Sequence, residues 1–347
     1  MKTILRIISL VMVLSFFISV SPVFAETKLL FNCFIPRAHR VFSHIWQPWA
    51  MNIEKASQGR VKVEFSAAPL GPVPRHLDMI KKGIADVTFD QHNFNPKLFV
   101  LPTIASMPFA GLSSEAASVA LWRTHEKFFQ KANEHEGVKL LGFMVIGPSH
   151  LLTTKKEVKT IADAKNLKIR ISTRYAKEIC DALGVVMVSV PGPASYEIIS
   201  KGTVDGTTFS FSDIYNFRIS KFLKNAFVIP GGLYAASFSA IMNQKKWDSL
   251  SKADQDAIQS VSGEPLARLT RSWDEGDKAA YERMKKEGVK INFMSQAEKN
   301  QMQKQFAGIM EQWKVEAKKR GVDAEAAVAY HRKVLEEVAA TSWKPTP

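Results

Sequence analysis

Two segments of this chain repeat one pattern, and the repeat limits the folds available to it. The first copy, Ile80–Phe89, reads IKKGIADVTF, and the second, Ile199–Phe209, reads ISKGTVDGTTF. In each copy a Lys-Gly pair ends a short helix, and small residues with one Asp lead into a strand. Gly83 and Gly202 stand where a helix C-terminus favours a left-handed residue. A repeated β–α–β unit predicts two similarly built lobes; the alternative is a common turn met twice by chance.

The signals before the two copies come in the same order. Each copy follows a basic strand (Arg60–Phe65; Lys168–Ile171), a Leu-Gly pair (Leu70-Gly71; Leu183-Gly184) and a short helix. We interpret Asp86 and Asp205 as structural residues that close equivalent turns, rather than as a general acid and base that face one another.

The N-terminal 25 residues differ in character from the rest of the chain. Lys2 and Arg6 form a basic region before the almost wholly apolar run Ile7–Val20. Pro22–Ala25 then provides small residues before Glu26. This pattern predicts a secretory signal peptide cleaved after Ala25, and hence a periplasmic mature protein. The alternative, a single anchoring helix, fits less well because the apolar run is short and a cleavage site follows it.

Alternating strand and helix signals predict an α/β fold with a helical C-terminal region. The expected strands include Lys28–Phe34, Val138–Val145, Leu151–Thr154 and Phe238–Asn243, and the expected helices include Val41–Ala56, His76–Lys82, Ser113 to about Glu136, Leu266–Lys286 and Gln296–Lys319. We expect one lobe over residues 26–148 and about 234–272, and the other over 149–233 and about 273–347. The hinges should then lie near residues 146–152 and 230–236.

Charge and cysteine content exclude several classes of protein. The formal charge is +14, or about +12 without the signal peptide. The basic residues are scattered, and in Lys314–Arg320 they are mixed with Glu316 rather than with aromatic residues, so nucleic-acid binding is not expected. A basic solvated face is the simplest interpretation, and a field that attracts small anions is the alternative. We expect Cys33 and Cys180 to be free buried thiols, with a disulfide between them as the alternative.

The sequence contains no motif of a known catalytic or metal centre. It lacks a Gly-x-Ser-x-Gly elbow, a phosphate-binding Gly-rich loop and a His-Glu-x-x-His pair. The eight His are dispersed, and none has metal-ligand spacing with a Cys. No cofactor is therefore expected. An exported α/β hydrolase or transferase of unrecognised type remains the competing hypothesis, and it would need a catalytic cluster between the lobes.

Polar and aromatic residues follow the strands that end each repeat. His92 and Asn93 lie in a loop after the first copy, and loops at the C-terminal ends of strands form the ligand crevice of an α/β sheet. Phe209 and Phe211 follow the second copy, and Tyr234 comes later. Most aromatic residues of this kind belong to the core, but those in loops after strands are also suited to walling a pocket for a partly apolar ligand.

Arg170 is the most informative single residue. In Leu167–Ile171 the apolar residues alternate, which leaves Lys168 and Arg170 on the opposite face. A strand inside a parallel sheet normally has apolar residues on both faces, so a guanidinium there needs solvent or an anionic partner. Its planar fork matches a carboxylate through two parallel hydrogen bonds. Alternation alone still favours a solvated face.

These motifs together resemble the solute-binding subunits of TRAP (tripartite ATP-independent periplasmic) transporters, of the C4-dicarboxylate-binding or DctP-like type. The resemblance covers nearly all of the mature chain and rests on Ile161–Arg170, Leu183-Gly184, Tyr196–Gly206, Ser57–Val63, Leu70-Gly71, Lys82–Val87 and Met107–Phe109. It implies a class II-like periplasmic binding protein fold, which is two-lobed, has a helix spanning both lobes and acts as a monomer. Leu266–Lys286 is the candidate for that helix.

The resemblance also implies a function and a set of site residues. The implied protein binds a small organic acid between its lobes and delivers it to the small and large TRAP membrane subunits; a receptor that signals to a sensor kinase is the alternative. The family's carboxylate-binding arginine falls on Arg170, and a more variable polar position falls near His150. The expected ligand-binding residues are completed by Phe209, Phe211, His92, Asn93, Tyr234 and Phe34.

The chain departs from the family pattern at one position of the implied site. A position that is often Asn or another polar residue falls near Phe209, and Phe211 follows it closely. Two Phe side chains there disfavour a highly hydroxylated acid such as a sialic or uronic acid. They favour a smaller or partly apolar acid.

Overall fold

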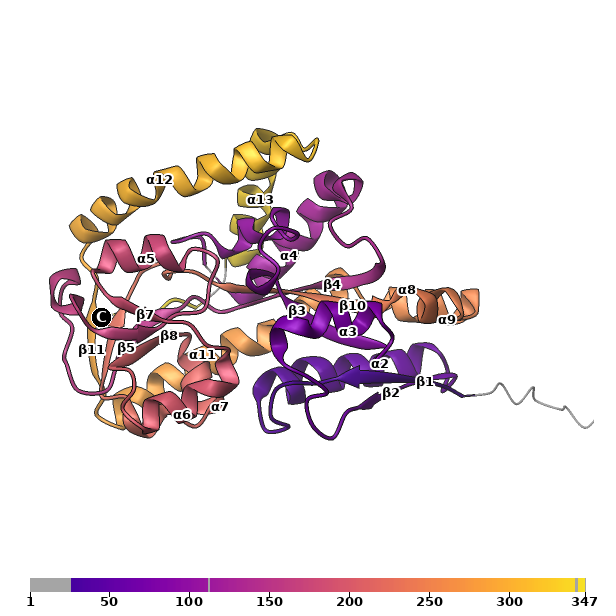
Figure 1. The fold of residues 1–347 in the computed structure, drawn as a ribbon, viewed down its shortest axis with the longest axis horizontal. Helices are drawn as coiled ribbons and strands as arrows, with labels where there is room; N and C mark the ends of the chain where they lie inside the picture. Colours follow the sequence, from indigo (N-terminus) through magenta and orange to yellow (C-terminus); the bar gives the residue numbers. More distant parts are fainter. Residues whose placement is uncertain (1–25, 112, 341–342, 347) are drawn as a thin grey trace, which may run out of the picture.

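The computed structural model describes residues 26–111, 113–340 and 343–346. The expected signal peptide lies outside the described residues. Among those residues, no helix has both the length and the apolar character needed to cross a membrane. Two separate β-sheets, each covered by helices, organise the chain (Figure 1).

The first sheet has five strands in the order β2-β1-β3-β10-β4. We call this sheet and the helices packed on it lobe I. β1 is parallel to β2 and β3, whereas β10 is antiparallel to both of its neighbours. The strands are β1 (Thr27–Asn32), β2 (Val61–Phe65), β3 (Val87–Gln91), β4 (Val138–Ile146) and β10 (Ala236–Asn243).

The second sheet has six strands in the order β11-β9-β5-β8-β6-β7 and forms lobe II. Here β6 is parallel to β7 and β8, and β5 is antiparallel to its neighbours β8 and β9. The strands are β5 (His150–Thr153), β6 (Lys168–Arg170), β7 (Val186–Val188), β8 (Gly206–Phe209), β9 (Asn225–Val228) and β11 (Lys290–Phe293).

The Asp of each repeat makes the same contact in its own lobe. The backbone N–H of Leu30 in β1 donates to Asp86 Oδ2 at 2.7 Å, and that of Lys168 in β6 donates to Asp205 Oδ2 at 2.8 Å. The N–H of each Asp returns a bond to the carbonyl of the same partner, at 2.9 and 2.7 Å. The prediction that these two residues close equivalent turns is confirmed.

The sequence-based alignment of the strands before the repeats was wrong. Asp86 bonds to β1 and Asp205 bonds to β6, so β6 (Lys168–Arg170) corresponds to β1 and not to β2 (Val61–Phe65). The strand of lobe II that corresponds to β2 is β7. Gly71 follows β2, whereas Gly184 ends a helix before β7, with φ of +66°. The two basic strands looked alike because both alternate charged and apolar residues, but one lies at a sheet edge and the other does not.

Helices cover both sheets and the connections between them. Lobe I carries a π-turn (Phe42–Trp46), α2 (Gln47–Ala56), α3 (His76–Lys81), α4 (Ser114–Thr124), α8 (Gln244–Asp248) and α9 (Lys252–Ser260). Lobe II carries α5 (Ala176–Leu183), α6 (Ser195–Ser200) and α7 (Phe211–Asn216). The C-terminal helices are α10 (Glu264–Arg268), α11 (Arg271–Lys286), α12 (Gln296–Lys319) and α13 (Ala324–Ala339).

The helix expected from Ser113 begins as predicted but ends early. Ser113 Oγ accepts a hydrogen bond from the N–H of Ala116 at 3.0 Å, so it caps α4. The regular α-helix stops at Thr124, and a π-turn and a 3-10 turn carry the chain to Ala132. Asn133, with φ of +46°, then turns the chain out of the helical conformation.

Helix α11 contacts both lobes. Asp274 accepts hydrogen bonds from the N–H groups of Ser114 and Glu115 at the start of α4, at 2.6 and 3.1 Å. One turn further along, Asp277 accepts from the N–H of Ser212 at the start of α7, at 2.7 Å. A carboxylate placed at a helix N-terminus satisfies otherwise unpaired donors. The expected lobe-spanning helix is confirmed, although a break after Arg268 divides it into α10 and α11.

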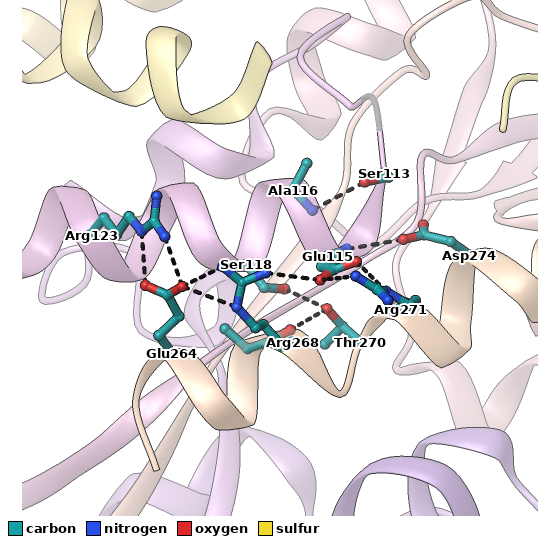
Figure 2. A network of polar contacts seen from close by, with 11 residues as sticks. Ser113, Glu115, Ala116, Ser118, Arg123, Glu264, Arg268, Thr270, Arg271 and Asp274 are labelled. Carbon is teal, nitrogen blue, oxygen red and sulfur yellow. Dashed lines mark hydrogen bonds and ion pairs between the residues drawn. The ribbon is translucent and has the colours of Figure 1, made fainter. Parts of the chain in front are cut away.

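A network of ion pairs fastens α10 and α11 to α4 of lobe I (Figure 2). Glu115 on α4 accepts from Arg271 at 2.7 Å and from Arg268 at 3.2 Å. Arg123, also on α4, makes a two-pronged contact with Glu264, both bonds being 2.8 Å. Thr270 at the break donates to Ser118 at 3.2 Å. The lobe I end of the spanning helix is therefore held by several charged contacts.

The last two helices return from lobe II to lobe I. In Figure 1, α12 starts on the side of lobe II and runs over the top of the view. It touches α5 at one side and the 3-10 segment Leu101–Ser106 at the other, and α13 then packs along α4. The lobe boundaries expected from the sequence stay a prediction, and this packing groups α13 with lobe I.

Cys33 and Cys180 are both free. Cys33 is buried and Cys180 is partly buried, and burial raises the pKa of each thiol. The alternative of a disulfide between them is therefore wrong for this structure.

Candidate functional site

A cavity lies between the lobes at the C-terminal ends of their strands. Lobe I lines it from the segment after β1, from β3 and β10 and from the end of β4. Lobe II lines it from the ends of β6 and β8 and from the segments after β6, β7 and β8. Its empty volume is about 590 Å³, including its opening to solvent. This is the region in which open α/β sheets bind ligands. Its lining residues include Phe34, His39, Phe89, Gln91, Ser149, Arg170, Ser172, Phe209, Asp213, Phe217, Tyr234 and Phe238.

Arg170, the last residue of β6, brings a buried positive charge to this cavity. Arg170 is only 3% exposed. Nε and Nη2 donate to the carbonyl of Val190 at 3.1 and 2.9 Å, and Nη1 donates to that of Thr208 at 3.4 Å. Burial lowers the pKa of the guanidinium, which starts high enough that Arg170 remains charged.

The Phe209 ring packs against this guanidinium. The Arg170 Cζ lies 4.3 Å from the centre of the Phe209 ring, a cation–π contact. Phe217 stacks on Phe209 at 5.3 Å between centroids. Phe209 and Arg170, both predicted ligand-binding residues, are thus brought together in the cavity.

Tyr234 and Phe34 line the same cavity. The Tyr234 hydroxyl lies 2.8 Å from Thr208 Oγ1, so it is fixed close to the strand that carries Phe209. Phe34 stacks on Phe89 at 4.3 Å, and Phe89 in turn contacts Phe238. These rings form an apolar wall on the lobe I side.

His92 and Asn93 lie beside the cavity rather than in it. His92 is fully buried between Ser237 and Ser239, whose hydroxyls lie 2.8 and 2.7 Å from its two ring nitrogens. Asn93 reaches Ser172 of lobe II at 3.4 Å. Both residues line a smaller neighbouring hollow. Their place is at the contact between the lobes.

His150 and Phe211 lie away from Arg170. The His150 ring stacks on Phe211 at 4.4 Å, and its Nδ1 accepts from the N–H of Ile229 at 3.2 Å. Burial lowers the pKa of His150 to about 3. Both side chains line a second hollow beside the connection from β4 to β5, together with Asp274 and Asp277 of α11. The structure does not bring them together with the other predicted site residues.

Sequence reasoning missed several residues of the cavity. His39, Gln91, Ser172, Asp213 and Phe217 line it; Gln91 is the last residue of β3, and the other four come within eight residues after a strand. A place at or after the end of a strand was the signal that could have identified them, because the same signal identified His92. Burial raises the pKa of Asp213 to about 7, against the opposing pull of the Arg170 charge.

Comparison with known proteins gives consistent results over most of the chain. A family model described as "Bacterial extracellular solute-binding protein, family 7" (DctP) matches residues 31–316. The chain is 30% identical to the Comamonas testosteroni protein called "Outer membrane transporter protein TsaT", over 88% of this chain and 91% of that one.

Two solved structures share both fold and sequence with it. One is a TRAP periplasmic solute-binding protein from Bordetella bronchiseptica with bound (R)- and (S)-mandelate. It is 33% identical to this chain with a TM-score of 0.87, and the match covers 90% of this chain and 100% of that one. The other is a marine metagenome TRAP solute-binding protein specific for aromatic acid ligands, crystallised with 3-hydroxybenzoate: 26% identity, TM-score 0.81, 90% and 99% coverage.

Proposed function

Because the chain belongs to the bacterial extracellular solute-binding proteins of family 7, the receptors of TRAP transporters, we propose that it binds a small aromatic carboxylic acid between its lobes. The bound acid is then delivered to a TRAP membrane permease from the periplasm. The observation that carries the proposal is a buried arginine in an aromatic cavity whose hydrogen bonds all go to backbone carbonyls.

The family and the two-lobed fold predicted from the sequence motifs are confirmed. Members of the family, and the proteins of similar structure, are binding proteins of transport systems rather than enzymes. The receptor function for a small organic acid follows from that family. The nature of the acid and the residues that hold it are the parts we propose.

The charge of Arg170 supports binding of a carboxylate. Among the described residues, no carboxylate oxygen lies within 4.0 Å of its guanidinium nitrogens, and its hydrogen bonds go to backbone carbonyls. A buried charge without an ionic partner is costly, and a ligand carboxylate would supply that partner. Three of the five N–H groups are used by these carbonyls. The two that remain can donate to both oxygens of a carboxylate.

The apolar wall supports an aromatic ligand. Phe34, Phe89 and Phe238 on the lobe I side face Phe209 and Phe217 on the lobe II side across one cavity. Such a wall would leave the hydroxyls of a sugar acid without partners, whereas it matches the planar ring of an aryl acid. The structurally similar proteins with bound mandelate and 3-hydroxybenzoate fit this assignment.

Closure of the lobes would complete the site. Its residues come from both lobes, so ligand contacts are greatest when the lobes are together, and this differential affinity shifts the protein toward its closed state. A closed, dry cavity also strengthens the charged hydrogen bonds of Arg170. Whether the partner is a permease or a sensor kinase does not change the binding site; genes for membrane subunits beside this gene would favour the permease.

Substitution of Arg170 tests the proposal. We expect Arg170→Ala to weaken binding of benzoate, mandelate or 3-hydroxybenzoate by about 2–3 kcal/mol or more, because the charged hydrogen bonds are lost. Arg170→Lys should recover only part of this, since an ammonium group lacks the planar fork. Calorimetric titration of the purified mature protein measures both effects.

An exposed arginine gives the control. Arg75→Ala removes a surface guanidinium paired only with Asp78 and should leave affinity unchanged. Unaltered affinity in Arg170→Ala for an acid that the wild type binds would disprove the role of Arg170. Failure of the wild type to bind any aryl acid, while it binds another acid, would disprove the aromatic assignment.

A further inference from the structure

Two residues that line the cavity each carry a buried polar atom without a hydrogen-bond partner. Among the buried side chains of the described residues, His39 Nε2 and Asp213 Oδ1 make no hydrogen bond, and both residues line the cavity that holds Arg170. The two residues are 2% and 4% exposed. Buried polar atoms nearly always have a hydrogen-bond partner. Two such atoms without a partner, on residues that line one ligand cavity, therefore suggest that the ligand supplies their hydrogen bonds.

The surroundings of His39 make its free nitrogen a donor. The N–H of Val41 donates to His39 Nδ1 at 3.2 Å, so Nδ1 carries a lone pair. Burial lowers the pKa of His39 to about 3, so the ring is neutral and its one proton is on Nε2. Trp273 and Phe217 hold the ring in place, with centroids 5.7 and 4.9 Å away.

Asp213 offers the complementary atom. Its Oδ2 accepts a hydrogen bond from Ser210 at 3.3 Å, which leaves Oδ1 unpaired. Burial raises the pKa of this carboxyl to about 7. Oδ1 is therefore an acceptor in the ionised form, and the carboxyl can also donate when it holds a proton.

Phe217 places both groups at one end of the cavity. Phe217 directly follows α7, and its N–H donates to the carbonyl of Asp213 at 2.9 Å, so the two residues lie about one helical turn apart at the C-terminal end of that helix. The His39 ring contacts Phe217 from lobe I, and the next residue, Arg40, donates its N–H to Asn216 at 3.2 Å. Phe209 stacks on the same Phe217 ring and supports Arg170.

We propose that the ligand is a hydroxylated aromatic acid whose hydroxyl accepts a hydrogen bond from His39 and donates one to Asp213, while its carboxylate pairs with Arg170. This assignment rests on the proposed function and names the substrate class of the same site. A hydroxyl is the one small group that is donor and acceptor together. A second carboxylate would meet the Asp213 carboxylate, and a methyl group would leave both polar atoms unpaired. Sites built for a hydroxyl reject analogues that lack it.

A set of matched acids tests the inference on the purified mature protein. Phenylacetate, (R)-mandelate, (S)-mandelate and 3-hydroxyphenylacetate share a ring and a carboxylate and differ in the presence and position of one hydroxyl. We expect at least one hydroxylated acid to bind about tenfold or more tightly than phenylacetate, as a gained buried hydrogen bond requires. Calorimetry provides the dissociation constants.

Paired substitutions then identify the residues. His39→Phe keeps a flat ring without the donor, and Asp213→Leu removes the acceptor; in each, the preference for the hydroxylated acid should fall to about twofold or less. His39→Gln and Asp213→Asn retain polar atoms of similar reach and should keep more of the preference. Circular dichroism and the affinity for phenylacetate show whether each variant is folded.

The outcomes separate this inference from the proposed function. Equal binding of phenylacetate and of every hydroxylated acid by the wild type overturns the hydroxyl site and leaves the aromatic-acid receptor standing. A preference that survives both His39→Phe and Asp213→Leu overturns the assignment to these residues. Absence of binding to all four acids, to benzoate and to 3-hydroxybenzoate by folded protein overturns both.

Discussion

At the scale of single residues, the two repeated aspartates have a structural function. Asp86→Ala or Asp205→Ala leaves one backbone N–H, of Leu30 or Lys168, without its carboxylate acceptor. We expect each substitution to lower the free energy of unfolding by about 1 kcal/mol, and by similar amounts in the two lobes. Ligand affinity should not change. Denaturant unfolding and calorimetric titration measure the two quantities.

A surface aspartate serves as the reference for this prediction. Asp181 pairs only with the exposed Lys177, so Asp181→Ala should change stability by a few tenths of a kcal/mol. The structural interpretation is wrong if Asp86→Ala and Asp205→Ala behave like Asp181→Ala. It is also wrong if they weaken ligand binding without affecting unfolding.

The same scale shows how far the sequence could predict the site. Arg170 and Phe209 lie where the motifs and the strand positions placed them, because both follow from a local pattern within β6 and β8. His150 does not: it is the first residue of β5 and lines the hollow behind the cavity, whereas Ser149, directly before that strand, lines the cavity itself. Phe211 differs from Phe209 because α7 begins there and ends the alternation. Which side a hinge residue faces depends on packing that a linear pattern does not contain.

At the scale of elements, α11 contacts the two lobes through two carboxyls, one partly buried (Asp274) and one buried (Asp277). Asp274 accepts a hydrogen bond from lobe I, and Asp277 accepts one from lobe II. Between β4 and β5, a Cβ added to Gly147 would lie only 2.5 Å from Asp277 Oδ2. The helix therefore packs directly against the hinge backbone. The sequence predicted this helix from its period, but it could not indicate which of its polar residues face inward.

Burial of Asp277 makes stability depend on pH. Burial raises its pKa to about 8, far above the ordinary value of 3.8 for an aspartate. Between these values the folded protein holds a proton that the unfolded chain releases, so this group's contribution to stability falls as pH rises toward 8 and is constant above it. The slope from this group is at most about 1.4 kcal/mol per pH unit. Asp277→Asn keeps an acceptor for the Ser212 N–H and should flatten the curve of unfolding free energy against pH between 4 and 8.

Other buried groups also titrate in this range, so the comparison must be a difference between variants. Asp213 and Asp274, whose pKa values burial raises to about 7 and 6, contribute in the same direction. Subtracting the Asp277→Asn curve from the wild-type curve isolates Asp277, and Asp181→Asn should give no difference. Parallel wild-type and Asp277→Asn curves would contradict the prediction.

At the scale of the whole molecule, the described conformation has its lobes in contact. Asn93 of lobe I bonds to Ser172 of lobe II, and Arg174 of lobe II donates to the carbonyl of Pro96 in lobe I. We expect the double variant Asn93→Ala, Arg174→Ala to favour an open form and to weaken ligand binding about threefold to tenfold, since closure then costs more. Small-angle X-ray scattering should show a larger radius of gyration without ligand and a return to the compact form at saturation.

Residues that contact only one lobe provide the control for closure. Substitution of Arg75, a surface residue of lobe I, should change neither the radius of gyration nor the affinity. If the double variant binds as tightly as the wild type and scatters identically, these contacts do not contribute to closure. The two-lobed arrangement itself was predictable from the repeat, whereas the contacts across the cavity join residues far apart in sequence and were not.

The strand order of lobe I has a consequence for the order in which the chain acquires its structure. β10 pairs with β3 on one side and β4 on the other, yet it is made only after five strands of lobe II. Until residues 236–243 are available, β3 and β4 each expose an unpaired edge, so lobe I cannot finish folding as the chain emerges N-terminus first. The two lobes must therefore mature together, late in synthesis or after translocation. A chain truncated before β10 would lack the strand that joins β3 to β4, and with it the cavity residues Ala236 and Phe238.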